Sequence, residues 1–345
     1  MTAQADLDTC REMIRHGSLS FHAASKLLPR GVCEPALALY AFCRLADDAV
    51  DLRQEKAAAV LELERRLDLV YAGRPRDTAP DRAFARMVEQ TGMPRALPDA
   101  LLEGLAWDAM GRRHDSFSDV VAYSARVASA VGVMMAVLMG VRDRHALARA
   151  CDLGVAMQLT NIARDVGEDA REGRLYLPLD WMEEAGIDPD GFLADPRPLP
   201  EIRTMTRRLV MRANSLYYRS EAGIAVLPRA CRPGIYAARL IYAGIGGKVA
   251  AAGYDSITTR AHTSKPRKLL WLAEAGIRAA LSTVTPSPAT LYAPPLPEVA
   301  FLVNAAARGA PEAGRAEALI SALSQLAATD RSRMNGLMQD RARAS

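Results

Sequence analysis

The amino-acid sequence predicts an all-α protein built around one large domain. Alanine and leucine dominate the composition, only 6% of residues are aromatic, and β-branched residues rarely alternate with polar ones. This combination favours helix over strand. Breaks rich in proline and glycine separate long stretches of helical periodicity, and no repeat of fixed length runs through the chain.

Periodicity and breaks together place the elements along the chain. Helices are expected at 34–72, 81–91, 99–111, 116–140, 144–171, 201–226, 234–253 and 266–283. Residues 1–285 are therefore predicted to form one helical domain. The segment 286–298 is expected to be a proline-rich linker to a C-terminal helical extension, 299–345, whose amphipathic part runs from 299 to 329.

Charge and cysteine content exclude several classes of protein. Forty-four Lys and Arg against forty Asp and Glu leave a net charge of +4, too mild for a nucleic-acid-binding protein. Five cysteines, an odd number with no C-x-x-C pair, indicate a reducing compartment. No signal-peptide pattern opens the sequence, and the uncharged run 127–141 is shorter than the roughly 20 residues that span a bilayer. A cytoplasmic protein is expected, with 127–141 buried in its core.

The segment 40–51 concentrates charge inside an otherwise apolar helical stretch. A spacing of 4, 3 and 4 residues puts Tyr40, Arg44, Asp47 and Asp51 on one face of a helix. Burying a charge without a partner costs several kcal/mol, so these acids need something positive to face.

A second stripe of the same kind lies in "QLTNIARDVGEDAREGRLYLP", residues 158–178. Gln158, Asn161, Asp165 and Asp169 follow at spacings of 3, 4 and 4 on a helix that is otherwise apolar. Two facing stripes of carboxylates would repel each other unless cations lay between them. Carboxylate and amide oxygens suit Mg²⁺ or Mn²⁺, ions that bind substrate phosphates through a few carboxylates.

Two interpretations of these stripes remain open at this point. Each aspartate pair can be a solvated helix face that is salt-bridged to neighbouring arginines, which is the commoner case for a single D-x-x-x-D. The second copy favours a divalent-ion and diphosphate site, in which Arg44, Arg164 and Arg174 clamp phosphate oxygens. For any single arginine, direct neutralisation of an aspartate is an equally good account.

At these residues the sequence resembles the squalene and phytoene synthase family, and within it the bacterial phytoene synthase branch. The resemblance covers about residues 15–275. Its motifs are "SLSFHAASKLLP" (18–29), "YAFCRLADDAVD" (40–51), "AYSARVASAVG" (122–132), the 158–178 segment, "ARLIYAGI" (238–245) and "YDSITTRAHTSKPRK" (254–268).

The resemblance implies a role for each matched position. The metal-binding set is Asp47, Asp51, Asn161, Asp165 and Asp169, and the catalytic set is Tyr40, Arg44, Tyr123 and Tyr242. Substrate binding is implied for Ser20, Phe21, Gln158, Arg164, Arg174 and Tyr176. The chain departs from the family pattern at His114, where a tyrosine is frequent.

The resemblance also implies a fold and a reaction. The fold is an isoprenoid-synthase-type helical bundle around a deep central cavity. The reaction is the head-to-head condensation of two geranylgeranyl diphosphates, through prephytoene diphosphate, to phytoene, with Mg²⁺ or Mn²⁺ and without NADPH. The apolar product implies peripheral contact with the inner face of the membrane, for which the C-terminal helix is the expected contact, and downstream carotenoid enzymes as partners.

Three alternatives accompany this interpretation. Squalene or dehydrosqualene synthesis from farnesyl diphosphate differs by cavity length and, for squalene, by a need for NADPH. A chain-elongating prenyltransferase would carry a second D-D-x-x-D, which "DVGED" does not match. A non-catalytic family member serving as an assembly factor is expected to have lost acids from one stripe, and both stripes are complete here.

Overall fold

The computed structural model describes residues 2–17, 27–51 and 56–308, without the side chains of 14–17, 46–51, 56–57, 265 and 308. Every regular element in these ranges is a helix, which confirms the predicted all-α fold. The first are α1 (Ala3–Gly17), α3 (Arg30–Asp51), α4 (Lys56–Tyr71), α5 (Ala79–Thr91), α6 (Ala96–Ala109), α7 (Phe117–Ser124), the π-helix η1 (Ala125–Ser129), α8 (Ala130–Leu138) and α9 (Arg144–Arg171). They are followed by α10 (Leu179–Glu184), α11 (Pro189–Ala194), α12 (Pro200–Ile224), α13 (Arg232–Ala251), α14 (Lys265–Leu281), the 3₁₀ turns η2 (Ala289–Tyr292) and η3 (Pro297–Val299), and α15 (Ala300–Arg308).

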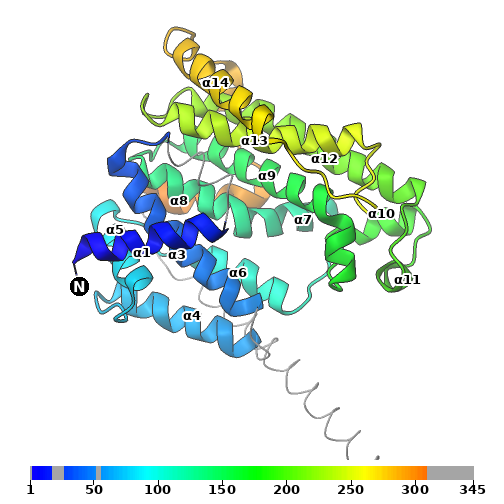
Figure 1. Ribbon diagram of the computed structural model, residues 1–345, viewed down its shortest axis with the longest axis horizontal. Coiled ribbons are helices and arrows are strands. Elements are labelled where there is room, and N and C mark those ends of the chain that lie inside the picture. The colour runs from blue at the N-terminus through cyan, green and yellow to red at the C-terminus, as the bar shows by residue number, and fades with distance from the viewer. Residues whose placement is uncertain (1, 18–26, 52–55, 309–345) are drawn as a thin grey trace, which may run out of the picture.

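Helix α9 is the central element of the bundle (Figure 1). It packs against α12 and α13 on one side and against η1, α8 and α15 on the other, while α14 covers the outer face of α13. Helices α1, α3, α4 and α5 form a group at the opposite side of the molecule from α14 (Figure 1). Side chains on the inward faces of all these helices join into one continuous hydrophobic core.

The sequence explains both ends of α9. Asp143 caps its first turn, because the carboxylate accepts hydrogen bonds from the backbone N–H groups of His145 and Ala146. The helix ends where Gly173 adopts a left-handed conformation, with φ of +74°. The helix itself has 28 residues, a length of about 42 Å at 1.5 Å per residue.

A π-helical turn interrupts the segment that the sequence predicts as one helix over 116–140. Helix α7, the turn η1 and helix α8 follow each other without a gap. Gly154 of α9 packs directly on this turn, where a Cβ atom would lie 2.5 Å from Cα of Ser129. Ser129 in turn donates a hydrogen bond to the carbonyl of Cys151 at 2.8 Å. The absence of a side chain at residue 154 thus lets α9 approach the π turn closely.

The helical stretch Phe117–Leu138 is apolar and long enough to cross a membrane. About two thirds of it, 67%, is buried inside the protein, and η1 and α8 pack against α6 and α9. This stretch includes most of the uncharged run 127–141, which the sequence predicts as a core helix. In the structure that part of the chain lies in the core.

One expected helix differs from the structure, and one observed helix was not expected. The predicted helix 34–72 is divided into α3 and α4, which are separated by residues outside the described ranges. Helix α1 was not predicted, because its charged sequence lacks a broad apolar face. It is attached to α5 by its fully buried Asp6, which accepts hydrogen bonds from Arg82 and Arg86.

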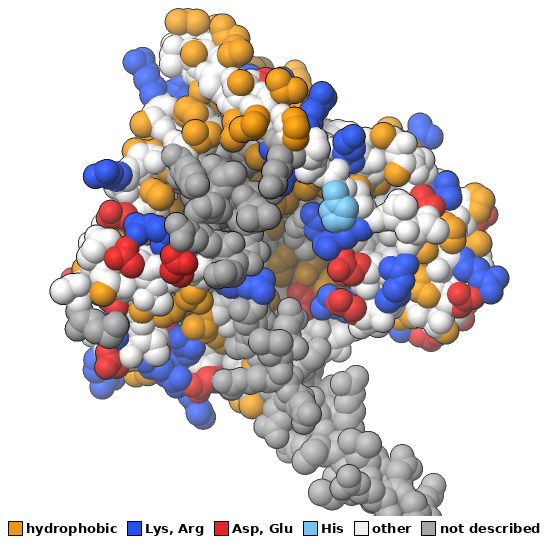
Figure 2. Space-filling view, in the orientation of Figure 1, with side chains coloured by type: hydrophobic (Ala, Val, Ile, Leu, Met, Phe, Trp, Pro, Cys, Tyr) orange, Lys and Arg blue, Asp and Glu red, His pale blue; other side chains and the backbone are white. Residues whose placement is uncertain are grey.

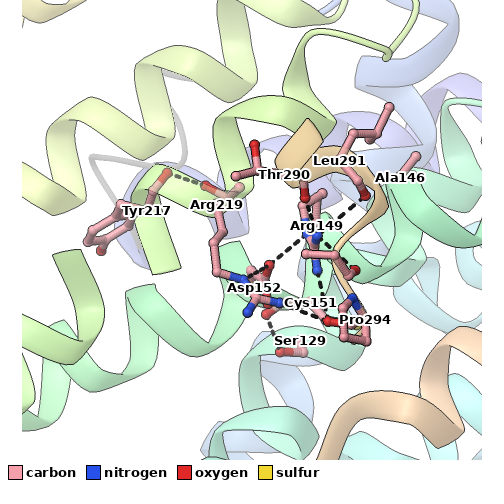
Figure 3. A network of polar contacts seen from close by, with 12 residues as sticks. Ser129, Ala146, Arg149, Cys151, Asp152, Tyr217, Arg219, Thr290, Leu291 and Pro294 are labelled. Carbon is pink, nitrogen blue, oxygen red and sulfur yellow. Dashed lines mark hydrogen bonds and ion pairs between the residues drawn. The ribbon is translucent and has the colours of Figure 1, made fainter. Parts of the chain in front are cut away.

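The proline-rich segment also differs from the expected linker. Fully buried Arg149 of α9 donates hydrogen bonds to the carbonyls of Thr290, Ala293 and Pro294, at 2.5, 3.0 and 3.4 Å (Figure 3). After this segment, α15 adds Leu302 and Val303 to the core. The cause is the need of a buried guanidinium for acceptors, which these carbonyls meet. Residues 286–308 are thus held against the main domain, and the remainder of the predicted extension, 309–345, lies outside the described residues.

Candidate active site

The polar stripe on α9 faces a hollow instead of the core. Gln158, Asn161, Asp165 and Asp169 are half-buried, whereas Leu159, Ile162, Ala163 and Val166 on the other faces of the helix are buried. The stripe contributes to a polar hollow of about 220 Å³, which is also lined by Arg44, Leu105, Asp108, Tyr123, Ile162, Arg174 and Tyr176. Residues from α3, α6, α7, α9 and the loop after α9 therefore meet at one site.

Asp165 is the better neutralised of the two acids of α9. It accepts hydrogen bonds from Arg164 and from Arg260, whose Nε lies 2.8 Å away. Burial raises the pKa of this carboxyl, but the two arginines outweigh burial and hold its pKa below the usual value. Arg164 therefore neutralises an aspartate directly, which was one of the two roles left open by the sequence. Arg260 plays the same part and was not predicted as a site residue.

Asp169 is poorly compensated by comparison. The Nε of Arg174 is 3.7 Å from its carboxylate, and Arg174 also pairs with Glu172. Burial raises the pKa of Asp169 to about 7; the charge of Arg174 lowers it, and the neighbouring carboxylates Asp165, Glu172 and Asp108 raise it. A half-buried carboxylate with this surplus of negative charge is suited to receive a cation.

Three side chains at the wall of the hollow form a compact cluster. Tyr123 and Tyr176 both donate to Asp108, at 2.8 and 2.7 Å. The two phenol rings are stacked with centroids 5.1 Å apart, and the ring of His114 lies 5.2 Å from that of Tyr123. Tyr123 and Tyr176 were predicted as site residues, whereas Asp108 was missed. The available signal was weak, because Asp108 is one of three acids in the mostly apolar helix α6.

A large apolar cavity adjoins the polar hollow and shares Gln158 and Asn161 with it. It has a volume of about 380 Å³ and is bounded by α3, α8, α9, α12 and α13. Along α9 its lining runs from Asn161 back to Ala146, a distance of about 22 Å at 1.5 Å per residue. Tyr40, Gln158 and Tyr242 belong to its lining. A polar head group and a long apolar tail can thus be bound side by side.

The structure brings most of the predicted site residues to these two adjoining spaces. Arg44, Asn161, Asp165, Asp169, Arg174, Tyr123 and Tyr176 line the polar hollow, and Tyr40 and Tyr242 line the apolar cavity. Asp47 and Asp51 belong to the last turns of α3, but their side chains lie outside the described residues, as do Ser20 and Phe21. Whether the two acidic stripes face each other therefore stays a prediction.

The described side chains include no group of three or more acids, histidines or cysteines close enough to hold a metal ion. Asp165 and Asp169, with the amide of Asn161, supply hard oxygen ligands from one stripe only. This donor set and the surplus negative charge at Asp169 fit a divalent cation that shares its coordination with a phosphate.

Comparisons with known proteins show the family to which the chain belongs. A family model described as squalene/phytoene synthase matches residues 14–267. A phytoene synthase of Cereibacter sphaeroides is 65% identical over 341 residues, which cover 96% of each chain. A phytoene synthase of Rhodobacter capsulatus is 60% identical over 334 residues, 96% of this chain and 98% of the relative. Among solved structures, a ligand-bound dehydrosqualene synthase is 30% identical, with a TM-score of 0.74, over 81% of this chain and 98% of its own.

The chain belongs to the squalene/phytoene synthase family. It is an enzyme that transfers prenyl groups. Its function is that of the phytoene synthases of carotenoid biosynthesis, as the near full-length identity to two such enzymes shows.

Proposed function

We propose that this enzyme condenses two molecules of geranylgeranyl diphosphate head to head to give phytoene, with divalent Mg²⁺ or Mn²⁺ and without a reductant. The observation that carries the proposal is the junction at Gln158 and Asn161 between a polar, acid-lined hollow and an apolar cavity about 22 Å deep along α9. The diphosphates occupy the hollow and the prenyl chains extend into the cavity.

Asp165, Asp169 and Asn161 would hold the metal ions, together with Asp47 and Asp51 of the first motif. When bound, such ions neutralise diphosphate charge and make it a better leaving group. Arg44 and Arg174 line the same hollow and are placed to bind phosphate oxygens. Arg164 and Arg260 hold Asp165 in place through its two carboxylate oxygens.

The reaction needs two ionisations in a dry space. In the first, one allylic diphosphate leaves, the double bond of the second molecule attacks the allylic cation, and loss of a proton closes the cyclopropane of prephytoene diphosphate. In the second, this intermediate loses its diphosphate, the carbon skeleton rearranges, and a final deprotonation gives phytoene. The cavity wall of Met135, Met139, Leu153, Met157 and Ile224 excludes water that would quench the cations.

Substrate length separates this proposal from the alternative on farnesyl diphosphate. The purified enzyme with Mg²⁺ should convert labelled geranylgeranyl diphosphate to phytoene at the same rate with and without NADPH. Labelled farnesyl diphosphate should give little hydrocarbon product. Efficient formation of a thirty-carbon hydrocarbon, or no phytoene with any divalent ion, would contradict the proposal.

Peripheral contact with the inner face of an anionic membrane is the second part of the proposal, because substrate tails and product are lipid-soluble. The outer face of α14 supports it. Leu270 and Ile277 are each 62% exposed, Leu281 is 56% exposed, and Val284 just after the helix is 80% exposed. Figure 2 shows hydrophobic side chains gathered over this helix at the top of the molecule, with basic side chains near them.

The opposite face of α14 is already occupied, because Trp271, Ala275 and Ala279 are buried and the helix packs on α13. The exposed row therefore has no partner among the described residues. Arg267 and Lys268 in the first turn supply positive charge suited to anionic head groups. The sequence predicted the C-terminal extension as the contact, and residues 309–345 of that extension lie outside the described residues.

Flotation with vesicles of phosphatidylglycerol and phosphatidylcholine distinguishes membrane contact through α14 from contact through the C-terminal extension. The double variant Leu270→Glu, Ile277→Glu should lose most vesicle binding, while a chain ending at residue 308 should keep it. Truncation at 308 preserves α15 and the segment held by Arg149. If only the truncated chain fails to float, the contact belongs to the extension. We also propose contact with downstream carotenoid enzymes. Binding to the same membrane would favour this contact, because it would bring the enzymes together.

A further inference from the structure

Asp108 lines the polar hollow but belongs to neither aspartate motif. It is the next-to-last residue of α6, and its two carboxylate oxygens each accept one phenol hydrogen bond, from Tyr123 of α7 and from Tyr176 of the loop after α9. The three residues come from separate segments, 15 and 68 positions from Asp108 along the chain. Their meeting at one point is therefore a product of the fold and not of local sequence.

The arrangement fixes where each phenol oxygen directs its proton and its lone pairs. Because both O–H groups donate to Asp108, the remaining lone pairs are the only hydrogen-bonding capacity that the two phenol oxygens have left. Ring stacking between the tyrosines and the buried ring of His114 behind them restrict rotation of the phenols. The phenol oxygens at this wall of the hollow are consequently acceptors.

The electrostatics keep both phenols neutral. Burial, and after it the negative charge of Asp108, raises the pKa of Tyr123 and of Tyr176 far above the ordinary value for tyrosine. A free phenolate is therefore not the base. A neutral phenol that donates to a carboxylate can accept a proton only if it passes its own proton on at the same time.

We propose that Asp108 is a positioning residue for both tyrosines and the final acceptor of the proton that the substrate cation loses through Tyr123. The inference rests on the proposed reaction and assigns the base that the reaction requires. In the step that closes the cyclopropane, a C–H bond of the cation breaks and its electron pair forms the new carbon–carbon bond. The proton moves to the phenol oxygen of Tyr123, and the phenol proton moves to a carboxylate oxygen of Asp108. Asp108 ends as a neutral carboxylic acid, and it returns its proton to solvent or diphosphate before the next turnover.

The variant Asp108→Asn tests this directly. Asparagine is close to aspartate in shape, but it cannot take up the proton, and its amide nitrogen cannot accept a hydrogen bond from a phenol. With geranylgeranyl diphosphate and saturating Mg²⁺, kcat should fall by about 100-fold or more, as expected for loss of a general base, while KM changes little. Among the products that do form, the ratio of prenyl alcohol to prephytoene diphosphate and phytoene together should rise, because a cation that cannot lose its proton is captured by water.

Glu103→Gln is the matched control, because it neutralises another buried acid of the same helix. Glu103 pairs with Arg126 at 2.9 Å and does not line the hollow. This variant should keep the wild-type product ratio even if its melting temperature falls. Asp108→Glu should recover part of the lost rate, since it restores a carboxylate that can reach the phenols. Normal product ratios in Asp108→Asn, or the same altered ratio in Glu103→Gln, would overturn the inference.

Two further readouts separate the inference from other roles of Asp108. In a Tyr123→Phe background, Asp108→Asn should add little, because both changes interrupt one proton path; independent, additive losses would argue against that path. The Mg²⁺ concentration for half-maximal rate should be unchanged in Asp108→Asn. A large increase would make Asp108 a metal ligand and refute the proton role. Failure of the wild-type enzyme to make phytoene would instead refute the proposed function.

Discussion

Helix α9 carries buried charge near both ends, and the two ends differ in how that charge is balanced. Near its N-terminus, Arg149 and Asp152 are fully buried, lie 2.7 Å apart, and are completed by Arg219 and backbone carbonyls (Figure 3). Near its C-terminus, Asp165 and Asp169 are 14% and 16% exposed. Arg164 and Arg260 neutralise Asp165, but Asp169 has a surplus of negative neighbours. The protein itself balances the charges near the N-terminus, whereas the charge of Asp169 is left for a ligand to balance.

The difference shows how one helix can serve stability and function at once. A buried ion pair whose members also have hydrogen-bond partners on other segments contributes to a rigid fold, and removing one member leaves the other unpaired in an apolar interior. An incompletely balanced carboxylate destabilises the empty protein but gives binding energy to a cation. The same substitution, aspartate to asparagine, should therefore have opposite consequences at the two ends.

Asp169→Asn should give the largest effect, on turnover. It removes a metal ligand, so kcat should fall by about 1,000-fold or more, since metal stabilisation of a leaving group contributes several kcal/mol. The melting temperature without divalent ions should stay the same or rise, because a poorly compensated charge is removed. Steady-state assays and thermal unfolding check the two parts. Turnover near the wild-type rate would remove Asp169 from the site.

Asp152→Asn should give the next largest effect, on stability alone. It leaves the buried Arg149 without a counter-charge, so the free energy of unfolding should fall by about 3–5 kcal/mol. Asp152 lines neither the hollow nor the cavity, so kcat per folded molecule should stay close to wild type. Urea unfolding and active-site-normalised rates measure both quantities. A stable but inactive Asp152 variant would contradict the proposed difference between the two ends of α9.

The pH dependence of metal binding should sharpen the comparison further. The pKa of Asp169 is about 7 in the ion-free protein, above the usual value for aspartate near 4. The folded state therefore holds this proton more tightly than the unfolded state, and stability of the ion-free protein should fall as pH rises from about 4 to 7. Metal ions compete with the same proton.

The rise in melting temperature on adding Mg²⁺ should accordingly be small at pH 6, increase up to about pH 7 to 8, and then level off. One pH unit below the pKa, proton competition weakens binding by about tenfold, or about 1.4 kcal/mol. Thermal unfolding across this pH range provides the measurement. Asp169→Asn should abolish the trend, and an equal Mg²⁺ effect at pH 6 and pH 8 in the wild type would contradict it.

Arg219→Gln should give the smallest effect. Arg219 is partly exposed and hydrogen-bonds Asp152 at 3.0 Å, but Asp152 keeps its pair with Arg149 in the variant. Arg219 also donates to the carbonyl of Pro294, and loss of these two hydrogen bonds should lower the free energy of unfolding by about 1.5–3 kcal/mol at most, and less after solvent screening. A loss as large as that in Asp152→Asn would show that Arg219, and not Arg149, neutralises this acid.

Periodicity in the sequence was sufficient to predict α9 and its polar stripe. Spacings of 3 and 4 residues define one face of a helix, so Gln158, Asn161, Asp165 and Asp169 had to lie together once the helix formed. The neighbouring "GRLYLP" motif located Tyr176 by resemblance. In contrast, Asp108 is one of three acids in a mostly apolar helix, and neither its spacing nor its composition indicated the two phenols that it holds.

The sequence by itself determined that the protein is helical, which faces of its helices are acidic, and which family its motifs resemble, because these properties depend on residues within a few turns of each other. Only the tertiary structure decided which faces meet. The carbonyls that Arg149 contacts lie more than 140 positions away along the chain, and the partners of Asp108 lie on two other segments. Local spacing carries no information about such contacts, so packing alone determined which charges became internally balanced and which became a binding site.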